Sequence, residues 1–177
     1  MTFNLQAFII GYTVLATIII LYQNAFILDY RCTITQTFIA AVVAGEPMKN
    51  FVLWIADQLK KDSSSHYCPN GDEGSYDAYQ GSEPVTIYTK MWASGRNCDT
   101  IAERDTIAGS MWKLFEDKYK NGDSYIKLPE AGCLSGNHGG TYNTFLPFGT
   151  NKDKVYAQDC VNQKFPECVS GGENDLK

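Results

Sequence analysis

This sequence lacks the features of several common classes of protein. It has no basic cluster, and its net charge is −5. Nucleic-acid binding depends on neutralising phosphates with Lys and Arg, so the charge excludes a nucleic-acid partner. There is no C-x-x-C pair, and His66 and His138 are the only histidines, so we predict no metal site. The G-x-S-x-G, H-E-x-x-H and P-loop patterns are also missing, and we predict no catalytic residue and no cofactor.

Charge is absent altogether from the first 28 residues. The run from Leu5 to Leu28 is 24 residues long and mostly apolar. As a helix rising about 1.5 Å per residue, it would cross the ~30 Å hydrocarbon core of a bilayer. No Lys or Arg precedes the run, and no good cleavage site follows it.

We therefore expect residues 1–31 to be an uncleaved signal anchor that contacts the membrane through residues 5–28. The protein would then be a single-pass membrane protein whose remaining domain is lumenal or extracellular. Two alternatives stay open, a cleaved signal peptide that leads to secretion and a buried core helix of a soluble protein.

Six cysteines follow this segment, and their spacing does not fit a metal site. In the secretory pathway thiols oxidise, so we predict that all six form disulfides. Six cysteines allow about 15 pairings, which the sequence does not separate. The cysteines are Cys32, Cys68, Cys98, Cys133, Cys160 and Cys168.

Residues 32–84 are predicted to form a helix and a loop. The amphipathic pattern from Pro47 to Lys61 indicates a short packing helix. The stretch from Asp62 to Pro84 is rich in Ser, Gly, Asp and Tyr, so we expect a loop tethered by Cys68.

The core of the domain is predicted in residues 85–168. Apolar and polar residues alternate strictly from Val85 to Ala93, which indicates a half-buried strand. Thr100 and Glu103 match a capping box that opens a helix to about Lys120. An apolar stripe on that helix should face a sheet, and it comprises Ala108, Met111, Trp112, Phe115 and Tyr119.

Two further strands are predicted at Ser124–Leu128 and Thr141–Phe148, joined by Glu130–Gly140. Asp153–Val161 is a further helix or strand, and residues 169–177 are expected to be a flexible tail. The predicted fold is α+β. An N-terminal hydrophobic helix precedes a disulfide-bonded two-layer α/β sandwich with the order strand, helix, strand, strand.

Two segments carry a resemblance to a known group of proteins. They are Cys98–Ile107, with the sequence CDTIAERDTI, and His138–Tyr142, with the sequence HGGTY. With them, the chain resembles an uncharacterised budding-yeast family of small cysteine-containing membrane or secreted proteins, and more distantly the yeast killer-toxin-like proteins. The resemblance spans about Thr86 to Cys160. It implies an α/β sandwich outside the cytosol and no enzymatic activity. This chain lacks the dibasic processing series of the toxins.

The glycine-rich segment around His138 is the one candidate functional loop. It comprises His138, Gly139, Gly140, Thr141 and Tyr142. A flanked imidazole can act as a general base, although a loop histidine that bonds to nearby backbone is the more ordinary role. The two glycines are better explained by a turn than by phosphate binding, because no helix follows them.

Aromatic residues offer a second kind of site. Tyr67, Tyr76, Tyr79 and Trp92 are candidates for a surface that binds sugars or a protein. Our main hypothesis is a non-enzymatic, membrane-anchored extracytoplasmic domain that binds a protein or a cell-wall component. The alternatives are a secreted killer-toxin-like effector and a hydrolase that uses His138.

Overall fold

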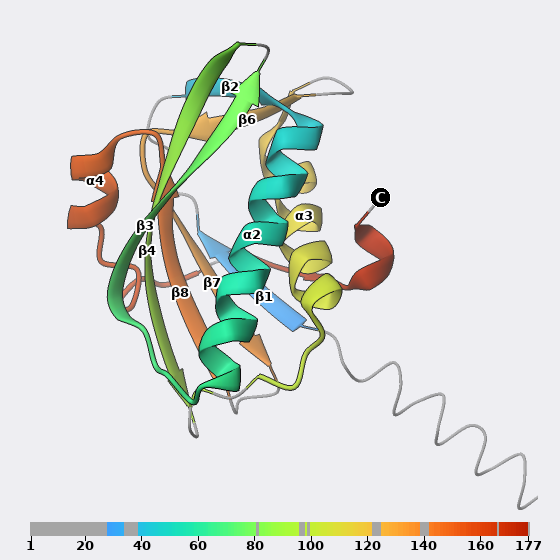
Figure 1. Ribbon diagram of the computed structural model, residues 1–177, viewed down its shortest axis with the longest axis vertical. Helices are drawn as coiled ribbons and strands as arrows, with labels where there is room; N and C mark the ends of the chain where they lie inside the picture. Colours follow the sequence, from blue (N-terminus) through green and yellow to red (C-terminus); the bar gives the residue numbers. More distant parts are fainter. Residues whose placement is uncertain are drawn as a thin grey trace, which may run out of the picture.

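The computed structural model describes residues 28–33, 39–80, 82–95, 98, 100–121, 125–138, 142–165 and 167–176. Within these residues the protein is α+β, with three α-helices and two antiparallel sheets (Figure 1). The elements are, in chain order, β1 (Leu28–Thr33), β2 (Ile39–Ala44), α2 (Gly45–Ser64), β3 (Asn70–Gln80), β4 (Glu83–Gly95), α3 (Arg104–Tyr119), β5 (Lys120–Asn121), β6 (Tyr125–Pro129), β7 (Gly132–His138), β8 (Tyr142–Gly149), α4 (Lys152–Ala157), β9 (Glu167–Gly171) and the 3-10 helix η2 (Glu173–Asp175).

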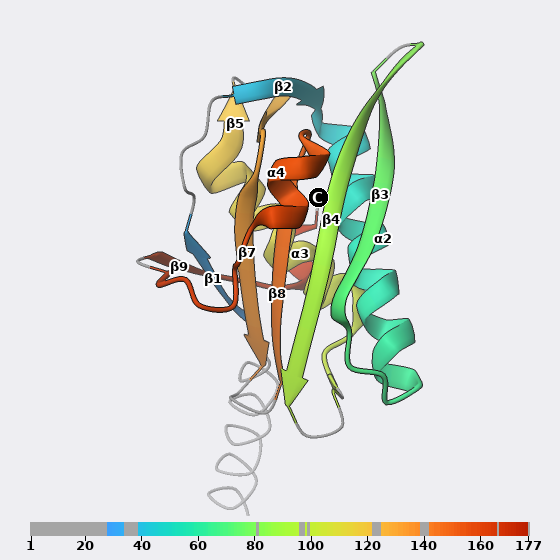
Figure 2. The ribbon, with the colours of Figure 1, turned by 90° about the vertical axis from the view of Figure 1, so that its left-hand side faces the viewer.

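The large sheet has six strands in the order β3-β4-β8-β7-β1-β9. Helices α2 and α3 lie side by side over one face of this sheet, which we call the inner face (Figure 1). The short helix α4 lies over the opposite, outer face (Figure 2). A smaller sheet, β2-β6-β5, packs at one end. The predicted sandwich of helices on a sheet is therefore present, and α4 is added outside it.

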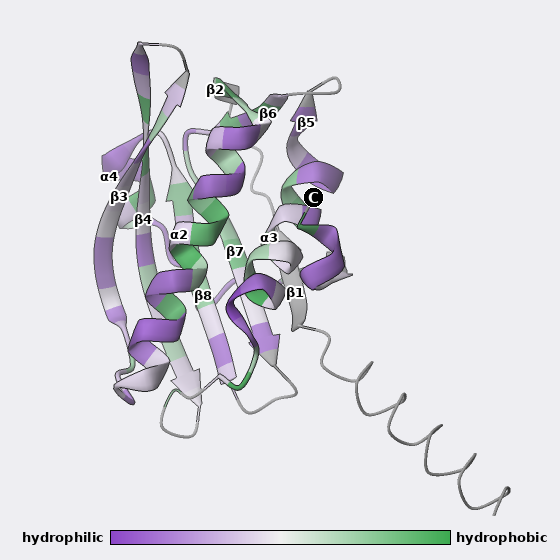
Figure 3. Ribbon diagram, turned by 45° about the vertical axis from the view of Figure 1, so that its right-hand side comes forward, coloured by the Kyte–Doolittle hydropathy of each residue, from purple (hydrophilic) through white to green (hydrophobic). Residues whose placement is uncertain are grey.

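Helix α2 confirms the prediction of a packing helix at Pro47–Lys61 and is slightly longer. Hydrophobic and hydrophilic residues alternate along its turns (Figure 3). Phe51, Ile55 and Leu59 recur every four residues and are at most 2% exposed. This spacing is that of a helix with one buried face, so the local pattern was sufficient to place it.

The core forms between the two helices and the inner face. Phe115 of α3 is fully buried, with its ring centroid 5.3 Å from that of Phe148 on β8 and 6.2 Å from that of Phe51 on α2. The predicted stripe on α3 is confirmed, because each of its five residues is buried. Alternation along β4 is confirmed as well, since Ile87 and Met91 face the core.

Strand β3 corrects the prediction of a loop at Asp62–Pro84. The segment is poor in the β-branched residues that favour strands. It nevertheless forms 11 residues of strand, and its register with β4 runs from Asn70 opposite Trp92 to Gln80 opposite Glu83. Pairing with a regular neighbour has outweighed the weak local preference.

Strand β7 is the second such correction. Glu130–Gly140 was predicted to be a connection, but Gly132–His138 lies inside the sheet and pairs with both β8 and β1. The C-terminal residues 169–177, expected to form a flexible tail, contain the end of β9 and η2. The Ser110 hydroxyl of α3 donates a hydrogen bond of 2.7 Å to the Gly171 carbonyl, which ties this segment down.

The start of α3 also differs from the prediction. The helix begins at Arg104, and the Glu103 side chain makes no capping hydrogen bond. Thr100 is held by the end of α2 instead, because its amide donates a bond of 2.8 Å to the Ser63 hydroxyl. The Lys60 ammonium donates a bond of 3.1 Å to the Ala102 carbonyl. These contacts keep residues 100–102 out of the helix.

The predicted anchor at residues 5–28 lies outside the described residues, except for Leu28, which begins β1. No helix in the described part of the chain is long and apolar enough to cross a membrane.

Candidate functional site

Among the side chains that the structure describes there are two disulfides, and they place four of the six cysteines. Cys68–Cys98 joins the segment after α2 to the segment after β4, and its Cα atoms are 5.2 Å apart. Cys133–Cys160 joins β7 to the segment after α4, with Cα atoms 5.6 Å apart. The other two cysteines lie on paired strands. In the register of β1 and β9, Cys32 is opposite Glu167 and Cys168 is opposite Arg31.

The candidate loop sits at the turn between β7 and β8. His138 is the last residue of β7 and pairs in register with Tyr142, the first residue of β8. Gly139, Gly140 and Thr141 lie outside the described residues. Tyr142 is 2% exposed, and burial, with the negative charge of Asp62, raises the pKa of its phenol. Tyr142 is therefore a core residue that anchors one side of the hairpin.

The four aromatic residues expected to share a surface do not share one. Tyr76 lies against α2, with its ring centroid 5.7 Å from that of Phe51. The Tyr67 hydroxyl donates a bond of 2.9 Å to the Asp72 carboxylate, and Tyr79 is 60% exposed. Trp92 points the other way, because it alternates with the inward residue Met91.

A different set of residues gathers around Trp92 on the outer face. Directly opposite residues of an antiparallel pair project from the same face of a sheet. The register places Phe145 of β8 opposite Trp92, and Ser135 of β7 opposite Phe145. Two positions further along, a second row crosses the same strands. We call these two rows the outer patch, and its members are Trp92, Phe145, Ser135, Ser94, Asn143 and Asn137.

The outer patch is accessible and firmly supported. Its two aromatic and two Asn side chains are half-buried, Ser94 is exposed and Ser135 is buried. Among the described helices, α4 is the one that lies over this face (Figure 2), and its Tyr156 contacts Tyr88 and Lys90, which precede Trp92 on β4. The Phe165 ring supports Phe145 at a centroid distance of 6.4 Å.

The Trp92 ring is fixed from two sides. The indole lies beside Gly71 of β3, where an added Cβ atom would be 3.4 Å from Cε2 of the ring, an ordinary van der Waals contact. The Lys90 ammonium is 5.1 Å from the ring centroid and donates a bond of 3.0 Å to the Tyr156 carbonyl. A ring held in this way is preorganised, so little rotamer entropy would be lost when a ligand covers it.

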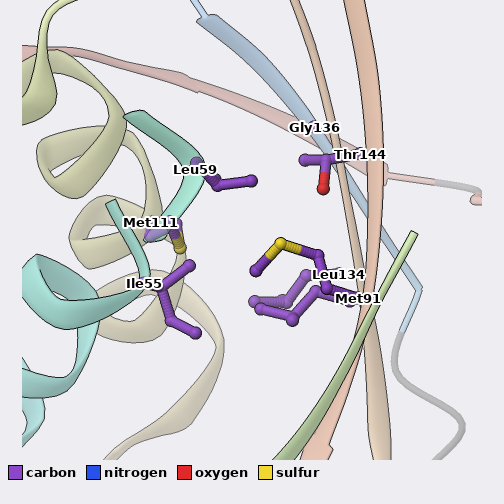
Figure 4. A pocket seen from close by; sticks show the side chains of 8 residues that line it. Ile55, Leu59, Met91, Met111, Leu134, Gly136 and Thr144 are labelled. Atoms are coloured by element: carbon purple, nitrogen blue, oxygen red, sulfur yellow. The ribbon is translucent and has the colours of Figure 1, made fainter. Parts of the chain in front are cut away.

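One cavity lies between the helices and the inner face (Figure 4). Ile55 and Leu59 of α2 point into it, together with Met111 of α3, Met91 of β4 and Leu134 of β7. Its volume is about 10 Å³, close to the space of one water molecule, and its walls are apolar. It is a packing defect of the core and has no room for an organic ligand.

Among the residues that the structure describes, no group of three or more His, Cys, Asp or Glu side chains is arranged to hold a metal ion.

Comparisons with known proteins identify a family but no function. No curated protein and no solved structure shows a significant match to the chain. A family described as a family of unknown function, DUF6736, matches residues 28–156, which is most of the chain. This match begins at the first residue of β1 and ends within α4. The chain therefore belongs to this family of unknown function.

Proposed function

We propose that this protein is a membrane-anchored, extracytoplasmic binding module that presents the outer patch to a ligand and catalyses no reaction. The single observation that carries the proposal is the outer patch itself. Aromatic side chains are enriched where proteins bind partners, because a rigid ring buries a large area at little entropic cost. Trp92 and Phe145 supply such rings on neighbouring strands.

The disulfides support an extracytoplasmic location. Disulfides persist in oxidising compartments and are rare in the cytosol, where thioredoxin and glutathione reduce them. Both cysteines of the Cys133–Cys160 disulfide are buried, and the bond connects β7 to the segment that follows α4. A disulfide in such a place holds the residues around Phe165 beside the outer patch.

The position of β1 supports a close association with the membrane. Leu5–Ile27 contains 23 residues before the strand begins. About 20 helical residues span the ~30 Å hydrocarbon core, which leaves roughly three residues, or at most ~10 Å of extended chain. The domain would be held at the membrane surface with no flexible linker. Because Asp29 is opposite Asn137, the Asn137 row of the outer patch lies at the end of the sheet where the anchor would join it.

The test uses the full-length protein in the cells that express it. Carbonate extraction and protease protection report whether the domain is anchored and outside the cytoplasm, and mass spectrometry identifies the mature N-terminus. We expect Met1 to be retained and the domain to be digested by external protease. A soluble, secreted protein that starts near Phe26 would refute the anchor and favour a secreted effector.

Binding is tested with the purified full-length protein and the insoluble wall fraction of the same cells. We expect Phe145→Ala to reduce co-sedimentation with this fraction, because it removes an accessible ring from the outer patch. Tyr79→Ala is the matched control, since Tyr79 is an exposed aromatic on the same sheet but outside the patch. Equal co-sedimentation of the two variants would refute binding through the outer patch.

A further inference from the structure

We infer that the ligand of the outer patch is an uncharged polysaccharide chain, which names the ligand class of the binding function proposed above and depends on it. The patch consists of two parallel rows that cross β4, β8 and β7. One row carries the rings of Trp92 and Phe145, and the other carries Ser94 and the amides of Asn143 and Asn137.

The outer patch has no ionisable side chain, although the chain as a whole has a net charge of −5. On β1 the two rows continue with one residue of each sign, since Arg31 is opposite Ser135 and Asp29 is opposite Asn137. On β4, Lys90 already donates to the Tyr156 carbonyl and lies over Trp92. Because Arg31 and Asp29 carry opposite charges, a charged ligand of either sign would also meet a like charge, and it would lose hydration on binding. The complement of this surface is therefore an uncharged molecule.

The two rows match the two kinds of surface on a sugar ring. The C–H face of a pyranose is apolar and can cover an aromatic ring, while its hydroxyls project from the edge. Amide side chains both donate and accept hydrogen bonds, as hydroxyls do. Residues two apart along a strand are ~7 Å apart. A ring stacked on the aromatic row thus has its hydroxyls within reach of the amide row.

The dimensions favour a chain over a small molecule or a protein. Each row crosses three strands and is ~10 Å long, since strands are ~4.8 Å apart. The surface is flat, whereas small ligands are normally enclosed in a pocket. A stable protein interface uses roughly 20 to 30 residues on each side. The outer patch has six residues, one of which, Ser135, is buried, so it is too small for a stable protein partner.

The test is affinity electrophoresis and calorimetry of the full-length protein in a detergent without a sugar headgroup. The uncharged probes are β-1,3-glucan, β-1,4-glucan and α-mannan, and the charged probes are heparin and polygalacturonate. We expect at least one uncharged probe to bind. Its affinity should be unchanged between about 50 and about 500 mM salt, because no ion pair is involved.

The variants locate the site. Phe145→Ala should weaken binding about tenfold through lost ring burial. Asn143→Ala, a half-buried polar residue whose loss should not disturb folding, should weaken binding about fivefold through lost hydrogen bonds. Tyr79→Ala and Tyr125→Ala, which change exposed aromatics outside the patch, should bind like the natural protein. Thermal unfolding of each variant checks that it is folded.

The outcomes separate the ligand class from the binding function. Binding of an uncharged probe that depends on both Phe145 and Asn143 supports the inference. Two results would overturn the ligand class and leave the binding function standing. One is binding of charged probes alone. The other is binding of no probe while retention by the insoluble wall fraction still depends on Phe145. Wall retention that is independent of Phe145 overturns both.

Discussion

Gly109 lies in the middle of α3, and its replacement by Ala tests how the C-terminal segment packs on this helix. In an isolated helix Gly→Ala stabilises by about 1 kcal/mol. Here an added Cβ would lie 1.9 Å from the Gly172 carbonyl oxygen and 2.7 Å from its carbonyl carbon. These are backbone atoms, so the whole segment from Gly171 to Leu176 must move to relieve the overlap.

The expected change is a net loss of stability. Displacing the segment breaks the hydrogen bond from Ser110 to Gly171, which is worth about 1 kcal/mol. It also disturbs the packing of Leu176 against the core, and overpacking typically costs about 1 to 3 kcal/mol. After subtraction of the helix-propensity gain, Gly109→Ala should lower the free energy of unfolding by about 1 to 3 kcal/mol.

The assay is urea unfolding of the oxidised protein, followed by tryptophan fluorescence, since Trp112 of α3 is a buried reporter. Gly172→Ala is the matched control. A Cβ at that position meets no atom within 4 Å, so its effect should stay within about 0.5 kcal/mol. In a chain that ends at Gly171 the obstructing carbonyl is gone, and Gly109→Ala should now stabilise by about 1 kcal/mol. If Gly109→Ala stabilises the full-length protein by the same amount, the C-terminal segment does not pack on α3 as described.

Three further predictions concern the core, the pH response and the cysteines. Phe115→Ala should destabilise by about 3 to 5 kcal/mol, because it leaves a cavity among three aromatic rings, and a loss below about 1 kcal/mol in urea unfolding would contradict the packing of α3. Burial is the main cause that raises the pKa of Asp62, and the negative charge of Asp72 is the second. Ionisation of Asp62 therefore lowers the free energy of unfolding as the pH rises through the folded-state pKa. Asp62→Asn should therefore raise the melting temperature at about pH 7 and have no such effect at about pH 3, and the opposite order in a calorimetric pH series would refute this. Alkylation of the denatured, non-reduced protein should label none of the six cysteines if Cys32 and Cys168 are also oxidised, whereas labelling of four or more would contradict the two disulfides seen here.

Several elements were predictable because their patterns are local. Helix α2 and the stripe on α3 follow from the spacing of apolar residues, and the alternation along β4 fixes which side chains face inward. Each pattern arises because a single core-facing side must be buried, and this requirement acts within one segment. The oxidised state of Cys68, Cys98, Cys133 and Cys160 agrees with the prediction from cysteine number and spacing.

Strand β3 shows how a local signal can be overlooked. Its composition of Gly, Asp, Ser and Tyr suggested a loop. The dipeptide Gly81-Ser82, however, separates the end of β3 from the start of β4, and such a two-residue unit is a known hairpin signal. Giving this dipeptide more weight than composition would have predicted the strand. Strand β7 has no such local signal. Its sequence is rich in glycine, and it is held in the sheet by pairing with β8 on one side and β1 on the other.

The sequence by itself determined α2, the apolar stripe of α3 and the alternation of β4, since each depends on residues close together in the chain, and its cysteine content predicted disulfides. Only the tertiary structure decided the outer patch, because Trp92, Ser135 and Phe145 become neighbours through the register of three strands. It also decided the start of α3, where Ser63 holds Thr100, and the need for glycine at position 109 beneath Gly172. These features depend on contacts between distant segments. Such contacts form only when the sheet and the helix layer close on each other, and no local pattern encodes their register.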